Sequence, residues 1–199
     1  MSHSHGGIPL DSTNSAKRAL RAHLRREREL HFAPESWSHI LHSREIQAAH
    51  IVASYISYGV EPQTQDINSA LIGAGKTLLL PKTLDDNDIE WVIWGGSQDS
   101  LRKNGRVLEP IGAAFLDLNS IEVVIVPALQ IDSTGNRMGQ GGGSYDRALP
   151  RLSGWKVGLV GATELAVEPL PVENHDQRMN AAATPSLLMR FTPGAAVHL

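Results

Sequence analysis

The residues with the greatest capacity for chemistry lie in one stretch, Asn136-Arg137-Met138-Gly139-Gln140-Gly141-Gly142-Gly143-Ser144-Tyr145-Asp146-Arg147. Its glycines predict positive φ angles or close approach of the backbone to a ligand, because ordering glycine is entropically costly. Two arginines can form charge-assisted bonds to phosphate, and Asp146 can cap a helix or contact a hard cation. An apolar run precedes the stretch and a helical pattern follows it. This order favours a loop that binds phosphate through main-chain N–H groups, followed by a helix N-terminus.

Two better-known phosphate fingerprints do not fit. Gly75-Lys76-Thr77 resembles the end of a P-loop, but the required first glycine falls on Ala70 and the segment opens a strand instead of a helix. Gly139-Gln140-Gly141 begins a dinucleotide fingerprint whose third glycine position holds Ser144. The sequence therefore argues against a P-loop and against a nicotinamide site.

Two other groups of polar residues are candidates to join this loop. Lys17 and Arg21 are four residues apart in a predicted helix, so they share a face that can clamp one anion; a solvated charged face is the alternative. Downstream, Asp176 can share a metal ion with Asp146, form a catalytic pair with His175, or lie solvated in a turn. Mg²⁺ typically takes one or two carboxylates and completes its shell with water and phosphate.

The pattern of elements predicts one α/β domain. Strands are expected at residues 51–56, 77–80 (stopped by Pro81), 89–94, 121–126 and 155–160, and helices at 36–49, 65–74 and 145–152, with a polar loop at 101–110. A further helix should begin at residue 15, with Ser12, Thr13 or Ser15 as N-cap and with Ala16, Ala19, Leu20, His23 and Leu24 on its apolar face. Such alternation indicates a mostly parallel sheet between helices, with ligands at the carboxyl ends of the strands. Residues 1–14 are predicted to be a disordered extension and 15–199 a single domain.

Composition narrows the class of protein. Of 199 residues, 41% are hydrophobic and the formal net charge is −3, which suits a globular chain with no bulk attraction for nucleic acid. Cysteine is absent, which excludes disulfides and thiolate nucleophiles. No apolar run is long enough to span a bilayer, and the polar first residues do not form a secretory signal. We expect a cytoplasmic protein without membrane partners.

Several segments, taken in order, resemble one family. Residues 137–147, with Val126-Pro127, Asp132 and Gly135 before them, are similar to the signature loop of 5-formyltetrahydrofolate cyclo-ligases (5,10-methenyltetrahydrofolate synthetases). Further matches follow the same order along the chain: Lys17 and Arg21, residues 55–61 with Thr64, Glu109-Pro110, and residues 170–176. The resemblance spans roughly residues 15–190.

The resemblance implies a three-layer α/β fold of the CoA-transferase-like kind and an ATP- and Mg²⁺-dependent reaction. In that reaction 5-formyltetrahydrofolate is cyclised to 5,10-methenyltetrahydrofolate, with release of ADP and phosphate. ATP phosphorylates the formyl oxygen, and N10 then attacks the activated carbon. Two alternatives remain: a non-catalytic relative that binds nucleotide or folate, and an enzyme of the same broad fold that acts on sugar phosphates or acyl-CoA.

The resemblance also assigns roles by position. The residues implied to bind ATP are Lys17, Arg18, Arg21, Arg137, Met138, Gly139, Gln140, Gly141, Gly142, Gly143, Ser144 and Tyr145. Those implied to bind folate are Ile56, Glu61, Gln140, Gly141, Gly142, Gly143 and Ser144, with Glu61 on the pterin. Asp146 and Asp176 would hold Mg²⁺, and Arg137, Tyr145 and Asp146 would be catalytic. A monomer is expected.

The loop departs from the family pattern at three positions. Many relatives carry a basic residue at Gln140 or Gly142 and an aromatic residue at Ser144. Gln130-Ile131 replaces a common Ala-Phe. The loop therefore carries less charge and less stacking surface, which motivates the non-catalytic alternative.

Overall fold

The computed structural model describes residues 10–173 and 176–192, and its centre is a seven-stranded sheet. The strands are β1 (Ile51–Ala53), β2 (Thr77–Thr83), β3 (Ile89–Ile93), β6 (Val123–Pro127), β9 (Trp155–Leu159), β11 (Ala181–Ala183) and β12 (Leu188–Arg190). Their order is β12-β11-β9-β6-β1-β2-β3. The four inner pairings are parallel, and the edge strands β3 and β12 run antiparallel. The predicted mostly parallel sheet is confirmed.

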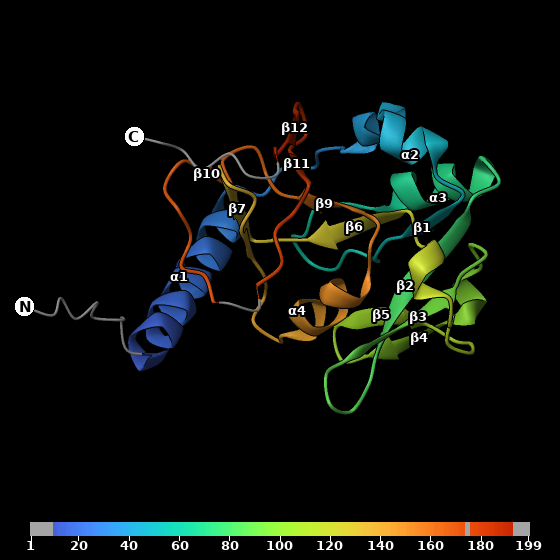
Figure 1. Cartoon of the computed structure of the whole chain (residues 1–199), viewed down its shortest axis with the longest axis horizontal. Helices are drawn as coiled ribbons and strands as arrows, with labels where there is room; N and C mark the ends of the chain where they lie inside the picture. The colour runs from blue at the N-terminus through green and yellow to red at the C-terminus, as the bar shows by residue number, and fades with distance from the viewer. Residues whose placement is uncertain (1–9, 174–175, 193–199) are drawn as a thin grey trace, which may run out of the picture.

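Helices cover both faces of this sheet, as the alternation of side chains along β6 requires. Val123 and Ile125 pack in one core with the 3₁₀-helix Ser38–His42, α2 (Arg44–Ala48) and α3 (Gln65–Gly73). Val124 and Val126 pack in the other with α4 (Ser144–Ala148). Figure 1 shows α2 and α3 on one side of β6 and α4 on the opposite side. The three-layer architecture is therefore confirmed.

Helix α1 (Leu10–Leu30) lies beside a smaller sheet of β10 (Leu165–Ala166), β7 (Gln130–Asp132) and β8 (Arg137–Met138) (Figure 1). It begins at Leu10, so the three predicted N-caps lie inside the helix and the prediction that the helix begins at residue 15 is wrong. Residues 1–9 lie outside the described part of the chain. Leu20 and Leu24 pack against this smaller sheet. The predicted apolar face is wrong in part, because the exposed positions on α1 include Ala16, Ala19 and His23.

The polar loop predicted at residues 101–110 is instead a hairpin of β4 (Leu101–Asn104) and β5 (Val107–Pro110). Its two-residue turn begins with Gly105, at φ +59°. Glycine at the first central position suits a type II′ turn, which matches the twist of the two strands. Gly105-Arg106 was therefore a turn signal that the sequence contained.

Strand β2 continues through Pro81, contrary to the prediction that Pro81 stops it. Pro81 lies opposite Trp91, whose carbonyl accepts from Phe115. On the other side, β1 pairs with β2 only as far as Leu79. No neighbouring strand therefore needs the N–H that proline lacks.

Two predicted helices are shorter than expected. The helix predicted at 36–49 is interrupted at Ser43, whose extended ψ of 143° ends the 3₁₀-helix. The Ser43 side chain then caps α2 by accepting from the Ile46 amide. The helix predicted at 145–152 becomes α4 and a 3₁₀ turn, Leu149–Arg151. Within residues 10–173 and 176–192, no helix is long and apolar enough to cross a membrane.

Candidate active site

A cleft opens at the carboxyl edge of the main sheet, where β1, β2 and β6 end. Its walls are residues 55–61 after β1, the end of β2 with β5, and residues 139–143 (the glycine loop) with the start of α4. Ligand-binding sites in open parallel sheets lie at this edge. Ile56, Glu61 and the predicted loop residues line the cleft, except Met138, which is buried in the core beside α1.

The conformation of the glycine loop explains its composition. Gly141 and Gly143 have φ angles of +102° and +75°, a region that side chains other than glycine rarely adopt. A Cβ on Gly139 would lie 2.5 Å from Nη1 of Arg137. Helix α4 has only five residues, so its dipole is small, and the loop's capacity for anions depends on its main-chain N–H groups and on nearby cations.

Asp132 supports the segment that leads into this loop. Its fully buried carboxylate accepts from the amides of Thr134, Asn136 and Leu170 at 2.8–3.0 Å, and from the Asn136 side chain at 2.7 Å. Burial acts to raise the pKa of Asp132, but these hydrogen bonds, that of Leu170 first, hold it below its usual value. Asp132 therefore joins the turn before β8 to the segment that carries Leu170.

Asp132→Ala is expected to lower the free energy of unfolding by about 3 kcal/mol or more, because several buried donors lose their acceptor. Chemical denaturation measures this loss. Ser133→Ala is the control: Ser133 is exposed, and its removal should cost less than about 1 kcal/mol. Equal stability of the two variants would contradict this structural role for Asp132.

The three residues predicted to be catalytic lie in one cluster. Arg137 donates through Nη1 to the Pro127 carbonyl (3.1 Å) and through Nη2 to Oδ1 of Asp146 (2.5 Å). Its guanidinium also lies 5.7 Å from the centre of the Tyr145 ring, which packs edge-on against Trp91. Among the described residues, the buried Tyr145 hydroxyl has no hydrogen-bond partner. Burial, and then the charge of Glu61, raise the pKa of Tyr145.

The basic residues of helix α1 contact different kinds of groups. Arg21 donates through Nε to the Gly139 carbonyl (3.2 Å). Lys17 is 4% exposed and donates to Glu173 and Asp176, both at 2.7 Å. Burial acts to lower the pKa of Lys17, but its two carboxylate partners raise it above the usual value. The predicted clamp of Lys17 and Arg21 on one anion is thus replaced here by separate contacts, and Arg18 is exposed.

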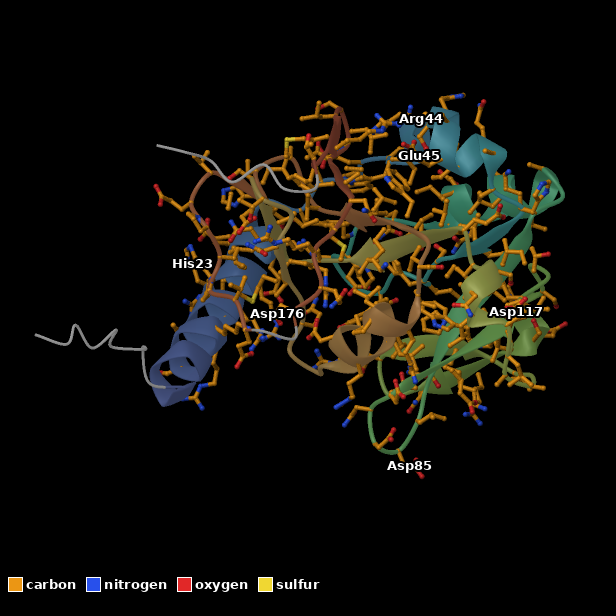
Figure 2. All side chains as sticks on the ribbon, in the orientation of Figure 1. His23, Arg44, Glu45, Asp85, Asp117 and Asp176 are labelled. Atoms are coloured by element: carbon orange, nitrogen blue, oxygen red, sulfur yellow. The ribbon has the colours of Figure 1, made fainter. Side chains whose placement is uncertain are left out.

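The two aspartates predicted to hold Mg²⁺ contact different cations. Asp146 pairs with Arg137, and Asp176 pairs with Lys17 beside α1 (Figure 2). His175 lies outside the described residues. Within the described ranges, no three acidic or histidine side chains form a group that could hold a metal ion. Two carboxylates still suit Mg²⁺ when phosphate and water complete its shell.

Glu61 lines the same cleft as the glycine loop. It is 5% exposed and accepts from the Tyr58 amide at 3.2 Å. Burial raises the pKa of Glu61 to about 7, although the Tyr58 amide, the charge of Arg28 and the side chain of Gln140 oppose this shift. A carboxylate removed from water in this way gains strongly from N–H donors on a ligand.

Two site residues were missed by the sequence analysis. Glu109, assigned there to a loop, is 2% exposed in the cleft and accepts from the Thr83 amide and the Asn104 side chain. Arg25 donates to the side chain and main chain of Gln140. Its position, one helical turn beyond Arg21, was a signal for a third contact from the same face.

Comparison with known proteins agrees with this architecture. The structure resembles the NMR structure of Aquifex aeolicus 5,10-methenyltetrahydrofolate synthetase, with a TM-score of 0.76 at 23% identity over 92% of this chain and 96% of that one. It also resembles the Mycoplasma pneumoniae 5,10-methenyltetrahydrofolate synthetase, with a TM-score of 0.62 at 16% identity over 83% and 96%. At these identities the likeness supports the fold.

Sequence comparison identifies the family. An Escherichia coli K12 5-formyltetrahydrofolate cyclo-ligase is 32% identical over 144 residues, which are 69% of this chain and 79% of that protein. A mouse 5-formyltetrahydrofolate cyclo-ligase is 22% identical over 190 residues, 85% and 93% of the two chains. The family model for 5-formyltetrahydrofolate cyclo-ligases matches residues 13–185. This chain therefore belongs to the 5-formyltetrahydrofolate cyclo-ligase family.

Proposed function

We propose that the cleft at the carboxyl edge of the sheet is where this chain carries out its cyclo-ligase reaction, the conversion of 5-formyltetrahydrofolate to 5,10-methenyltetrahydrofolate. The observation that carries this proposal is that two parts of the cleft lining differ in the chemical groups they can bind. The glycine loop with Arg137 suits phosphate, whereas the buried carboxylate of Glu61 suits a ligand that donates N–H groups. A phosphoryl donor and a pterin can therefore bind to different residues of one cleft.

ATP supplies the phosphoryl group that makes the formyl oxygen a good leaving group. Transfer of that group requires mainly positioning and neutralisation of charge. Arg21, held on the Gly139 carbonyl, and Arg137, held on the Pro127 carbonyl, place two cations beside the start of the glycine loop. These anchored side chains lose little freedom when a phosphate binds.

The carboxylates are proposed to exchange partners when Mg²⁺ and triphosphate enter. Asp146 pairs with Arg137, and Lys17 contacts the two carboxylates of Asp176 and Glu173. Asp146 and Asp176 can turn to the metal while Arg137 and Lys17 turn to phosphate, so that each of these four groups exchanges one charged partner for another. Lys17 would thus reach phosphate only after leaving its carboxylate partners.

Glu61 is proposed to hold the pterin. Its two oxygens can accept two adjacent N–H groups, which fixes the ring in one orientation. Ile56 lines the same wall and can pack against the ligand. We expect the chain to act as a monomer in the cytoplasm.

The direct test uses purified protein, ATP, Mg²⁺ and 5-formyltetrahydrofolate, with methenyltetrahydrofolate absorbance as the readout. Product formation should require all three additions. Tight folate binding without ATP consumption would reject catalysis in favour of the non-catalytic alternative. A screen of sugar phosphates and acyl-CoA compounds should show no turnover.

A further inference from the structure

Arg25, which does not line the cleft, makes two hydrogen bonds to Gln140 of the glycine loop. Its Nε donates to Oε1 of Gln140 at 2.9 Å, and its Nη2 donates to the main-chain carbonyl of the same residue. A guanidinium presents its donors in a rigid planar fork. The two bonds therefore restrain both the backbone position of Gln140 and the rotation of its side chain.

These two hydrogen bonds determine which end of the Gln140 amide faces the cleft. Arginine can only donate hydrogen bonds, so the amide oxygen of Gln140 must turn towards Arg25. The amide nitrogen is then the end left to face the cleft, which Glu61 also lines, and the Gln140 side chain acts to lower the pKa of that carboxyl. Gln140 and Glu61 line the cleft together, and all three residues line an adjoining second cavity.

We propose that Arg25 is a positioning residue for the folate substrate: it orients the Gln140 amide, and that amide holds the Glu61 carboxylate in place for the pterin. The inference rests on the proposed function, because it takes Glu61 as the pterin acceptor. Arg25 is exposed, so its removal should change the site without unfolding the chain.

Other charged and titratable groups also surround Glu61, and the test must separate them from Arg25. They are Arg28 and Glu29 of α1, Arg137 of β8, Tyr145 and Asp146 of α4, Tyr55 and Tyr58 of its own segment, and Lys103, Arg106 and Glu109 of the hairpin. None of them is changed when Arg25 is replaced. A shift in the pH profile of an Arg25 variant thus reports the contact through Gln140 or the charge of Arg25 itself.

Three single variants separate orientation from charge. Arg25→Ala should raise KM for 5-formyltetrahydrofolate about three- to tenfold at pH 7, the effect of one ordinary hydrogen bond, with kcat and KM for ATP nearly unchanged. Arg25→Lys keeps the charge but lacks the fork, so it should resemble Arg25→Ala. Arg26→Ala, at the exposed neighbouring position, should match the parent protein.

The pH profile and a double variant complete the test. Without an oriented donor from Gln140, the Glu61 carboxylate is less favoured, so the acid limb of kcat/KM for folate should move to higher pH in Arg25→Ala. Gln140→Ala should show the same shift, and Arg25→Ala combined with Gln140→Ala should be no worse than Gln140→Ala alone.

Three results would overturn the inference. These are an Arg25→Lys variant equal to the parent, an Arg25→Ala variant with unchanged folate affinity, or a loss that falls on KM for ATP instead. Calorimetric titration of 5-formyltetrahydrofolate without ATP measures the effect of Arg25 even if the parent protein makes no product. Failure of the inference is therefore distinguishable from failure of the proposed activity.

Discussion

Asp146→Asn is expected to lower kcat for cyclisation by at least about 100-fold, equivalent to about 2.7 kcal/mol of transition-state stabilisation. Asparagine retains an oxygen that can accept from Arg137, which now lies 2.5 Å from Oδ1 of Asp146. It lacks the negative charge that a hard cation prefers. The loss should therefore fall on metal-dependent turnover, whereas the fold and the position of Arg137 are retained.

Initial rates measured over a range of Mg²⁺ concentrations, together with a thermal melt, test this prediction. The matched control is Asp117→Asn, an exposed aspartate that does not line the cleft and is labelled in Figure 2, which should leave both the rate and its Mg²⁺ dependence unchanged. Turnover by Asp146→Asn at the parental rate, with the parental Mg²⁺ requirement, would exclude a metal-binding role for Asp146.

Glu61→Gln is expected to make the protein more stable at pH 8 and to weaken its binding of folate. Burial raises the pKa of Glu61 from 4.5 to about 7 in the folded chain. The folded state therefore holds a proton that the unfolded state has released between these values, and stability falls as the pH rises from 4.5 to 7. Above pH 7 the full cost of the buried charge is present, roughly 3 kcal/mol for a shift of this size.

Removal of this charge should recover most of that free energy at pH 8 and almost none well below pH 4.5, where Glu61 is protonated in both states. Thermal or chemical denaturation at the two pH values measures the difference. Glu29→Gln, an exposed glutamate at the rim of the second cavity, is the control and should change stability little at either pH.

Folate binding by Glu61→Gln should fall by about ten- to 100-fold, because hydrogen bonds to a charged acceptor contribute about 1.5–3 kcal/mol. Direct titration with 5-formyltetrahydrofolate measures this loss. A variant that is less stable at pH 8, or that binds folate as tightly as the parent, would contradict the assignment of Glu61. Gain of stability with loss of affinity is typical of a site residue kept in an unfavourable environment for function.

The local pattern of residue types along the chain was sufficient to predict most of the architecture. The β-branched run around Val123–Pro127 predicted a central strand because a parallel strand covered by helices on both faces must be apolar throughout. The α3 helix and strands β3 and β9 lie within one or two residues of their predicted limits. The glycine loop was also predicted, because backbone positions with positive φ angles favour glycine, and glycines are visible in the sequence.

The sequence by itself thus determined the family, the sheet and the loop, and only the tertiary structure decided which charges meet. Lys17, Arg25 and Arg28 looked alike as members of a basic helical face. The fold pairs Lys17 with Asp176, Arg25 with Gln140 and Arg28 with the distant Glu164. Helical spacing shows that residues share a face, but the partner of each depends on long-range packing. The burial that raises the pKa of Glu61 likewise arises only when residues 55–61, α1 and the glycine loop come together.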